Sequence, residues 1–178
     1  MNKAGSHQWE VHEKDSTLKK CPLAHDYILW MSLRTHPEKH TFDDYREFIL
    51  THTDWPRIWE LRDQAEGRLT ASDQTPQLIH WFTQYPPRSI PGHFAFIKVL
   101  KDSSYQKKYK EQIQYVWQNI MMSPADRQYF LAHYGKYLTA HDFYHRYRLA
   151  LKKNHFQEAE KLIPFLPAQD QEAARYRL

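Results

Sequence analysis

Two pairs of histidines in this sequence have the spacing that could hold a metal ion. His36 and His40 form one pair, and His141 and His145 form the other. Histidines four residues apart leave the same face of a helix, where both rings can reach one zinc ion. A zinc site needs a third and usually a fourth ligand. Pro37 places the first pair in a predicted loop, and the second pair, HDFYH, lacks the glutamate of the HExxH motif.

We therefore interpret both pairs as solvated or partly packed histidines, and we predict neither a metal site nor a cofactor. The predicted helix that carries HDFYH continues with two arginines. His141, His145, Arg146 and Arg148 thus cluster on one helix, and these four residues are our candidates for an exposed, ligand-facing surface.

No other combination of residues carries a recognisable catalytic pattern. The chain has no serine in a nucleophile elbow, no glycine-rich phosphate loop, and one cysteine, Cys21, without the local signature of a catalytic thiol. Five glutamates could each be proposed as a general acid, but none has a context that would raise its pKa recognisably: Glu10, Glu13, Glu47, Glu60 and Glu66. We name no catalytic residue.

The composition predicts a folded, helical chain. The 178 residues are 41% hydrophobic and 26% charged, which is enough for a core of ordinary size. Only 4 glycines and few runs of β-branched residues argue against an all-β fold with many tight turns. The formal net charge of +4 suits an anionic partner, although many soluble domains with no such partner carry as much. One cysteine excludes an internal disulfide.

The periodicity predicts about ten amphipathic helices joined by short turns, and no strand. The first runs from Pro22 to Leu33 with an apolar face of Ala24, Tyr27, Ile28 and Met31. Several residues predict where helices begin: Thr41 with Asp44, Asp54 with Pro56, Ser123, and Thr139 with Asp142. Gly135 predicts where one helix ends. The segment QYPPRSIPG is the one proline-rich break.

Helix pairs that follow one another in sequence favour a solenoid over a closed bundle. The pair from Leu138 to Leu166 resembles a tetratricopeptide hairpin, with Ala159 as the small residue where the two helices approach. We predict an all-α fold, a right-handed superhelix (solenoid) of about ten antiparallel paired helices. Residues 1–21 are predicted to form an N-terminal helical or loosely ordered segment, and residues 22–178 the superhelical domain.

Aromatic and basic residues lie close together at two places, where they could bind single-stranded nucleic acid by stacking and phosphate contacts. Trp55 precedes Arg57, and Tyr144 precedes Arg146 and Arg148. No nucleic-acid-binding motif accompanies them, so we interpret the aromatics as packing and predict no nucleic acid partner. Trp55 and Pro56 should fix a helix start, with Trp59 extending the contact; if Trp55 is buried, Trp55→Ala should cost about 3–5 kcal/mol.

Taken in order, several segments resemble the N-terminal helical superhelix of soluble lytic murein transglycosylases, in the form found in alphaproteobacteria. They are DWPRIWELRDQAE, then HWFTQYPPRSIPGHFAFIKVL, then WQNIMMSPADRQYFLAHYGKYLTAHDFYHRYRLALKKNHFQEAEKLIPFLP. The likeness runs from about Asp26 to the C-terminus. The resemblance implies a curved superhelix of paired helices beside a separate lysozyme-like domain that cleaves MurNAc–GlcNAc bonds of peptidoglycan to 1,6-anhydro products.

The catalytic Glu-Ser dipeptide of that family has no counterpart here, since no glutamate of this chain precedes a serine. The resemblance therefore implies a non-catalytic scaffold module, a fragment or truncated product, whose partners would be peptidoglycan glycan strands or a catalytic domain. The alternative is a helical-repeat adaptor that binds a protein partner. The family implies a periplasmic location, but residues 1–15 lack a signal peptide's apolar core, which predicts the cytoplasm for the chain as written. No stretch is apolar and long enough to span a bilayer.

Overall fold

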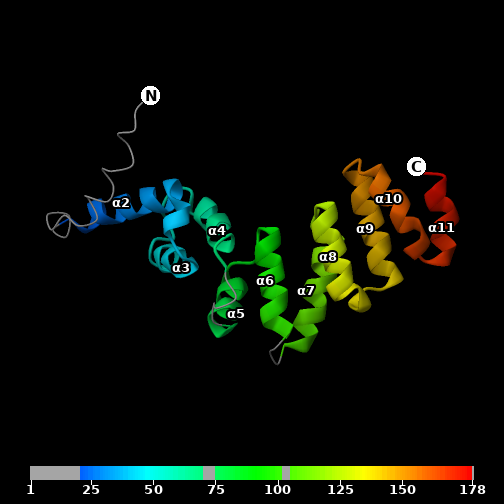
Figure 1. The fold of residues 1–178 in the computed structure, drawn as a ribbon, viewed down its shortest axis with the longest axis horizontal. Helices are drawn as coiled ribbons and strands as arrows, with labels where there is room; N and C mark the ends of the chain where they lie inside the picture. Colours follow the sequence, from blue (N-terminus) through cyan, green and yellow to red (C-terminus); the bar gives the residue numbers. More distant parts are fainter. Residues whose placement is uncertain (1–20, 70–74, 102–104, 178) are drawn as a thin grey trace. The chain divides into compact units, whose positions relative to one another are not determined.

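The computed structural model describes residues 21–69, 75–101 and 105–177, and every regular element in these ranges is helical (Figure 1). The predicted all-α class is therefore confirmed. The contacts divide the chain into two compact units. The described residues of unit 1 lie within 1–74 and 86–92, and those of unit 2 within 75–85 and 93–178. The prediction for residues 1–20 falls outside the described residues, and the superhelix over residues 22–178 stays a prediction.

Unit 1 contains helices α2 (Pro22–Thr35), α3 (Phe42–Thr51) and α4 (Ile58–Glu66), with a short 3-10 helix, η2 (Pro37–Lys39), between the first two. Its core side chains include Trp30, Leu33, Phe42, Tyr45, Phe48, Ile49, Leu61 and Ala65. The apolar face predicted for α2 is wrong: Tyr27 is exposed, whereas Trp30 and Leu33 are buried. The helix is apolar around most of its circumference, so the packing of α3 and α4 decides which face is covered.

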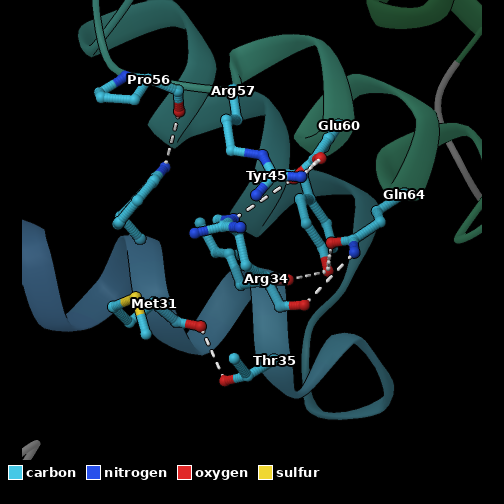
Figure 2. Close-up of polar contacts among 10 residues, drawn as sticks. Met31, Arg34, Thr35, Tyr45, Pro56, Arg57, Glu60 and Gln64 are labelled. Carbon is cyan, nitrogen blue, oxygen red and sulfur yellow. Dashed lines mark hydrogen bonds and ion pairs between the residues drawn. The ribbon is translucent and has the colours of Figure 1, made fainter.

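Polar side chains of α3 and α4 satisfy carbonyl groups at the end of α2 (Figure 2). The Tyr45 hydroxyl donates to Leu33 O at 2.8 Å, and Gln64 Nε2 donates to Arg34 O at 3.4 Å. These carbonyls lie in the last turn of α2, where no later amide of the helix can reach them. Burial raises the pKa of Tyr45 to about 12, so this hydroxyl stays protonated and remains a donor. The contacts fix how α2 ends in unit 1.

The DWP segment begins its helix later than predicted. Asp54 does not cap α4; the helix starts at Ile58 after Arg57, which has a left-handed backbone (φ 58°) and makes no side-chain cap. Trp55 packs edge-on against Phe48, with ring centroids 5.5 Å apart. It is only partly buried, so the cost expected for a buried Trp55 overstates its contribution. The Trp59 side chain is 51% exposed and does not extend the contact.

The proline-rich segment PPRSIPG is held to α4 by one buried carboxylate. Glu66 accepts hydrogen bonds from Arg88 N at 2.9 Å, from Ser89 N at 2.6 Å and from Ser89 Oγ at 2.6 Å. Ser89 Oγ in turn accepts from Gly92 N at 3.1 Å, as an N-cap residue does. A Cβ atom at Gly92 would lie 2.6 Å from Glu66 Cδ. The PPRSIPG sequence therefore needs glycine here because the carboxylate fills the space of a side chain.

Gly92→Ala should destabilise the chain by about 1–3 kcal/mol, the usual range for overpacking, because three donors hold the Glu66 carboxylate in place. Urea unfolding followed by circular dichroism measures the change. Gly135→Ala is the matched control: its nearest heavy atom would be Leu131 Cδ2 at 3.9 Å, so we expect no loss of stability. Equal stability of the two variants would contradict this role of Glu66.

Unit 2 contains the remaining helices. They are α5 (Thr75–Gln84), α6 (Ile90–Lys101, from His93 on), α7 (Gln106–Asn119), α8 (Pro124–Tyr134), η3 (Gly135–Tyr137), α9 (Ala140–Lys152), α10 (Phe156–Leu162), η4 (Ile163–Phe165) and α11 (Ala168–Arg175). Helix α9 packs against both α7 and α10, and Figure 1 shows α9, α10 and α11 alternating in direction. The core includes Trp81, Phe82, Ile97, Trp117, Phe130, Tyr147 and Ala159. The predicted approach of two helices at Ala159 fits its complete burial.

Two helix starts of unit 2, those of α8 and α9, follow their sequence signals. Ser123 Oγ accepts from Asp126 N at 3.1 Å at the start of α8, and Thr139 and Asp142 form the predicted capping box of α9. Burial acts to raise the pKa of Asp142, but hydrogen bonds from Thr139, Gln118 and Gln114 outweigh it and hold that pKa below its ordinary value. Gly135 follows the last residue of α8, as predicted. These caps set where α8 and α9 begin, and so position the residues discussed next.

Candidate ligand-binding pocket

A pocket of about 610 Å³ opens in unit 2 between the start of α8, the turn after α9, and α10. Its size lies within the range of small-molecule sites. The turn is sharp because Asn154 has a left-handed backbone (φ 60°), which asparagine tolerates better than most residues. Most of the lining residues have polar side chains, but apolar atoms make up the larger part of the surface that they expose to the pocket: Met122, Ser123, Pro124, Arg127, Asn154, His155, Gln157, Glu158 and Lys161.

Glu158 is the only carboxylate in this lining, and two arginines share it. Its Oε1 accepts from Arg146 Nε at 2.6 Å, and its Oε2 lies 2.6 Å from Arg127 Nη1. The Glu158 side chain is 7% exposed, that of Arg127 20%, and that of Arg146 is fully buried. Charges removed from water in this way are tolerated only when they are paired and hydrogen-bonded. The carboxylate is thus neutralised within the protein, and excess positive charge remains.

Arg146 also joins α9 to the end of α7. Its Nη1 donates to Trp117 O at 3.2 Å and to Ile120 O at 2.5 Å, and its guanidinium lies 5.3 Å from the centre of the Trp117 ring. Burial lowers the pKa of Arg146, and the Glu158 carboxylate opposes that shift, so the guanidinium remains charged. The prediction that Arg146 is exposed is wrong. Its side chain is fully buried, where it pairs with Glu158 and donates to two carbonyl groups at the end of α7.

The other three residues of the predicted ligand-facing surface lie outside the pocket. His141 and Arg148 are exposed and His145 is partly exposed, and none of the three lines the pocket. The rings of His141 and His145 meet with their Nε2 atoms 3.0 Å apart. Among the described residues, no group of three or more metal-binding side chains is placed to hold an ion. The structure therefore brings the two histidines together but not the four candidates as one surface.

The first histidine pair is separated by a 3-10 helix rather than joined on an α-helix. η2 occupies Pro37–Lys39, and His40 Nε2 lies 2.8 Å from Ser32 Oγ. Of the five glutamates considered as acids, Glu10 and Glu13 lie outside the described residues. Glu47 is exposed, Glu60 pairs with arginines, and Glu66 is the carboxylate that holds Ser89. The described glutamates thus have structural partners or lie in solvent.

Several donors of the pocket are left without a protein partner. Among the described residues, no hydrogen bond or ion pair joins the side chains of Asn154, Gln157 and Lys161 to another group, and all three are exposed. The Arg127 guanidinium uses one of its nitrogens on Glu158. A guanidinium carries five N–H donors, so most of those on Arg127 remain for another acceptor. The pocket can therefore offer a cationic set of donors to a ligand.

Sequence reasoning missed Arg127 and Glu158, although a signal for a buried charge was present. Arg146 follows Phe143 by three residues and precedes Ala150 by four, so it lies on the apolar stripe of its helix. A charged residue on such a stripe requires a partner of opposite charge. The partner lies on the next helix, where Glu158 precedes the predicted small contact residue Ala159. Arg127 had no such signal.

Comparison with protein-family models, with curated proteins and with solved structures found no match to the chain. Within residues 21–69, 75–101 and 105–177, no helix has the length and apolar character that crossing a bilayer requires.

Proposed function

We propose that this chain is a non-catalytic helical scaffold that holds an anionic polymer, and that the polymer is peptidoglycan. The observation that carries the proposal is the cationic pocket of unit 2, in which the Asn154, Gln157 and Lys161 side chains have no partner among the described residues. Peptidoglycan peptides carry carboxylates, which such donors bind. Peptidoglycan as the polymer is also supported by the segments that, in their order along the chain, resemble lytic transglycosylase superhelices. They also support a right-handed superhelical arrangement and a periplasmic place of action.

In this proposal the chain supplies binding and position, and a catalytic domain of a lytic transglycosylase supplies bond cleavage. Cleavage without water needs one carboxyl group that acts first as an acid and then as a base within a cleft that grips the glycan. The chain's part is to keep the strand close to such a cleft, which raises the local concentration of the substrate.

Co-sedimentation with purified peptidoglycan sacculi tests this function. We expect the chain to sediment with sacculi at low ionic strength and to be released as salt is added, because the contacts with exposed carboxylates are screened. A protein of similar size and net charge serves as the control for non-specific adsorption. If the chain stays in the supernatant with the control at every salt concentration, the proposed function is wrong.

The alternative is a helical-repeat adaptor that binds a protein partner, and exposed apolar side chains favour it. Phe156 and Phe165 in unit 2 are each more than half exposed. Large apolar side chains in solvent are typical of protein interaction sites when they are contiguous. A chain that captures one protein in stoichiometric amount and shows no retention on sacculi would support this alternative.

A further inference from the structure

We propose that the pocket between α8 and α10 binds the free carboxylate at the end of a peptide. The inference rests on the proposed function for the source of that peptide, a peptidoglycan stem, but the site stands on the geometry of unit 2 alone.

The charges in and behind the pocket favour an anion. Arg127 and Lys161 line the pocket, and Arg146 lies behind it, so three permanent cations outnumber the one carboxylate of the lining, Glu158. Glu158 is already shared by two guanidinium groups at 2.6 Å. The start of α8 adds little to this charge, because Ser123 caps it and the Asp126 carboxylate lies in its first turn. A second carboxylate entering from solvent would therefore meet excess positive charge.

The free donors match the oxygens of a carboxylate. Lys161 carries an ammonium group, Arg127 retains donors on a planar guanidinium, and the Asn154 amide adds two uncharged N–H groups. Charge-assisted hydrogen bonds of this kind are roughly twice as strong as neutral ones. The Lys161 side chain is exposed, and no partner among the described residues holds it elsewhere.

The acceptors in the lining favour a peptide over a phosphate group. The side-chain oxygens of Asn154 and Gln157 can accept hydrogen bonds, and a peptide offers amide N–H donors next to its terminal carboxylate. A phosphate group offers few or no donors to these exposed oxygens, so they would add nothing to its binding, whereas they can pair with the amide groups of a peptide. The volume of about 610 Å³ also exceeds what a single ion needs and accommodates several residues of a peptide.

Isothermal titration calorimetry with three probes at low ionic strength tests the proposal: N-acetylated trialanine, the same peptide with its carboxylate converted to an amide, and inorganic phosphate. We expect the peptide acid to bind about tenfold or more tightly than its amide, because the amide loses the charge-assisted bonds. We expect phosphate to bind more weakly than the acid. Equal binding of acid and amide, tighter binding of phosphate, or no binding of the acid would each overturn the proposal.

Two substitutions locate the binding in this pocket. Lys161→Ala removes an exposed charge, and Asn154→Gly removes the amide while glycine keeps the left-handed backbone without strain. Each should weaken binding of the acid about threefold to tenfold while the melting temperature stays within about 2 °C of wild type. Lys110→Ala on α7 is the matched control, since Lys110 is exposed and does not line the pocket. If the control weakens binding as much as Lys161→Ala, the site is not this pocket.

The outcomes separate this proposal from the proposed function. A chain that binds the peptide acid but does not sediment with sacculi supports the carboxylate site and contradicts the peptidoglycan scaffold. If wild type and Lys161→Ala sediment equally well with sacculi, and wild type does not bind the peptide acid, the scaffold is supported and the carboxylate site is overturned.

Discussion

Glu158→Gln is expected to lower the free energy of unfolding by about 3–5 kcal/mol, the usual cost of removing one partner of a buried ion pair. Arg146 is fully buried, and its Nε lies 2.6 Å from Glu158 Oε1. Without the carboxylate the guanidinium remains charged in a position that water does not reach, and its two carbonyl contacts at the end of α7 cannot neutralise it. Arg127 also loses its counter-charge. Urea unfolding at neutral pH measures the change.

Glu160→Gln is the matched control, because Glu160 lies on the same helix, is exposed and has no partner among the described residues. We expect a change within about 0.5 kcal/mol for this variant. The double substitution Arg146→Met with Glu158→Leu should be less destabilising than Glu158→Gln alone, since it removes the fully buried guanidinium together with its counter-charge and leaves only the partly exposed Arg127 unpaired. A loss below about 1 kcal/mol for Glu158→Gln would show that the pair does not hold α9 and α10 together.

His93 is expected to make the chain less stable as the pH falls from about 6.5 to about 4. Burial lowers the pKa of this histidine from 6.5 to about 4. In that window the unfolded chain binds a proton that the folded chain does not, so acid favours unfolding. The loss of unfolding free energy is absent above pH 6.5 and is complete below the pKa that His93 has in the folded chain. It amounts to about 3 kcal/mol in total.

Burial favours the neutral form of the His93 ring, and the hydrogen bond of the ring is compatible with that form. Gln112 Nε2 lies 3.1 Å from His93 Nδ1, a geometry in which the amide donates to an unprotonated nitrogen. His93→Gln preserves an acceptor and removes the titration. Between pH 7.5 and pH 4.5, the variant should therefore lose about 2–3 kcal/mol less of its free energy of unfolding than wild type loses. His80→Gln, which replaces an exposed histidine of α5, is the control and should leave the pH dependence unchanged. Identical pH profiles for wild type and His93→Gln would contradict the prediction.

Local signals in the sequence were sufficient where neighbouring residues decide the structure. Thr139 and Asp142 lie three residues apart and satisfy each other's backbone amides, so the start of α9 could be predicted from four residues. The start of α4 could not be predicted in this way. Asp54 has the side chain of a cap, but the chain turns at Arg57 with a left-handed backbone before the helix begins. That turn depends on tertiary contacts, among them the bond from Trp30 Nε1 to Pro56 O at 3.1 Å.

The pocket depends on contacts between helices, which one sequence does not specify. The signal for Arg146 is its place on an apolar stripe, which indicates burial, whereas Arg148 and the two histidines on the same helix favour a polar, exposed face. The structure shows that the ion pair to Glu158 joins α9 to the next helix, and that Arg127 reaches the same carboxylate from α8. Three helices therefore create the site, and the separation of their residues in sequence gave no pattern to search for.

The most direct test of a scaffold that holds peptidoglycan through this pocket is to map the contact by NMR. Backbone amide shifts of the labelled chain would be followed while solubilised peptidoglycan fragments with free carboxylates are added. We predict that the largest changes fall at residues 123–127 and 154–161, the start of α8 and the turn into α10. Changes confined to residues outside these ranges, or no changes at saturating fragment, would contradict the account.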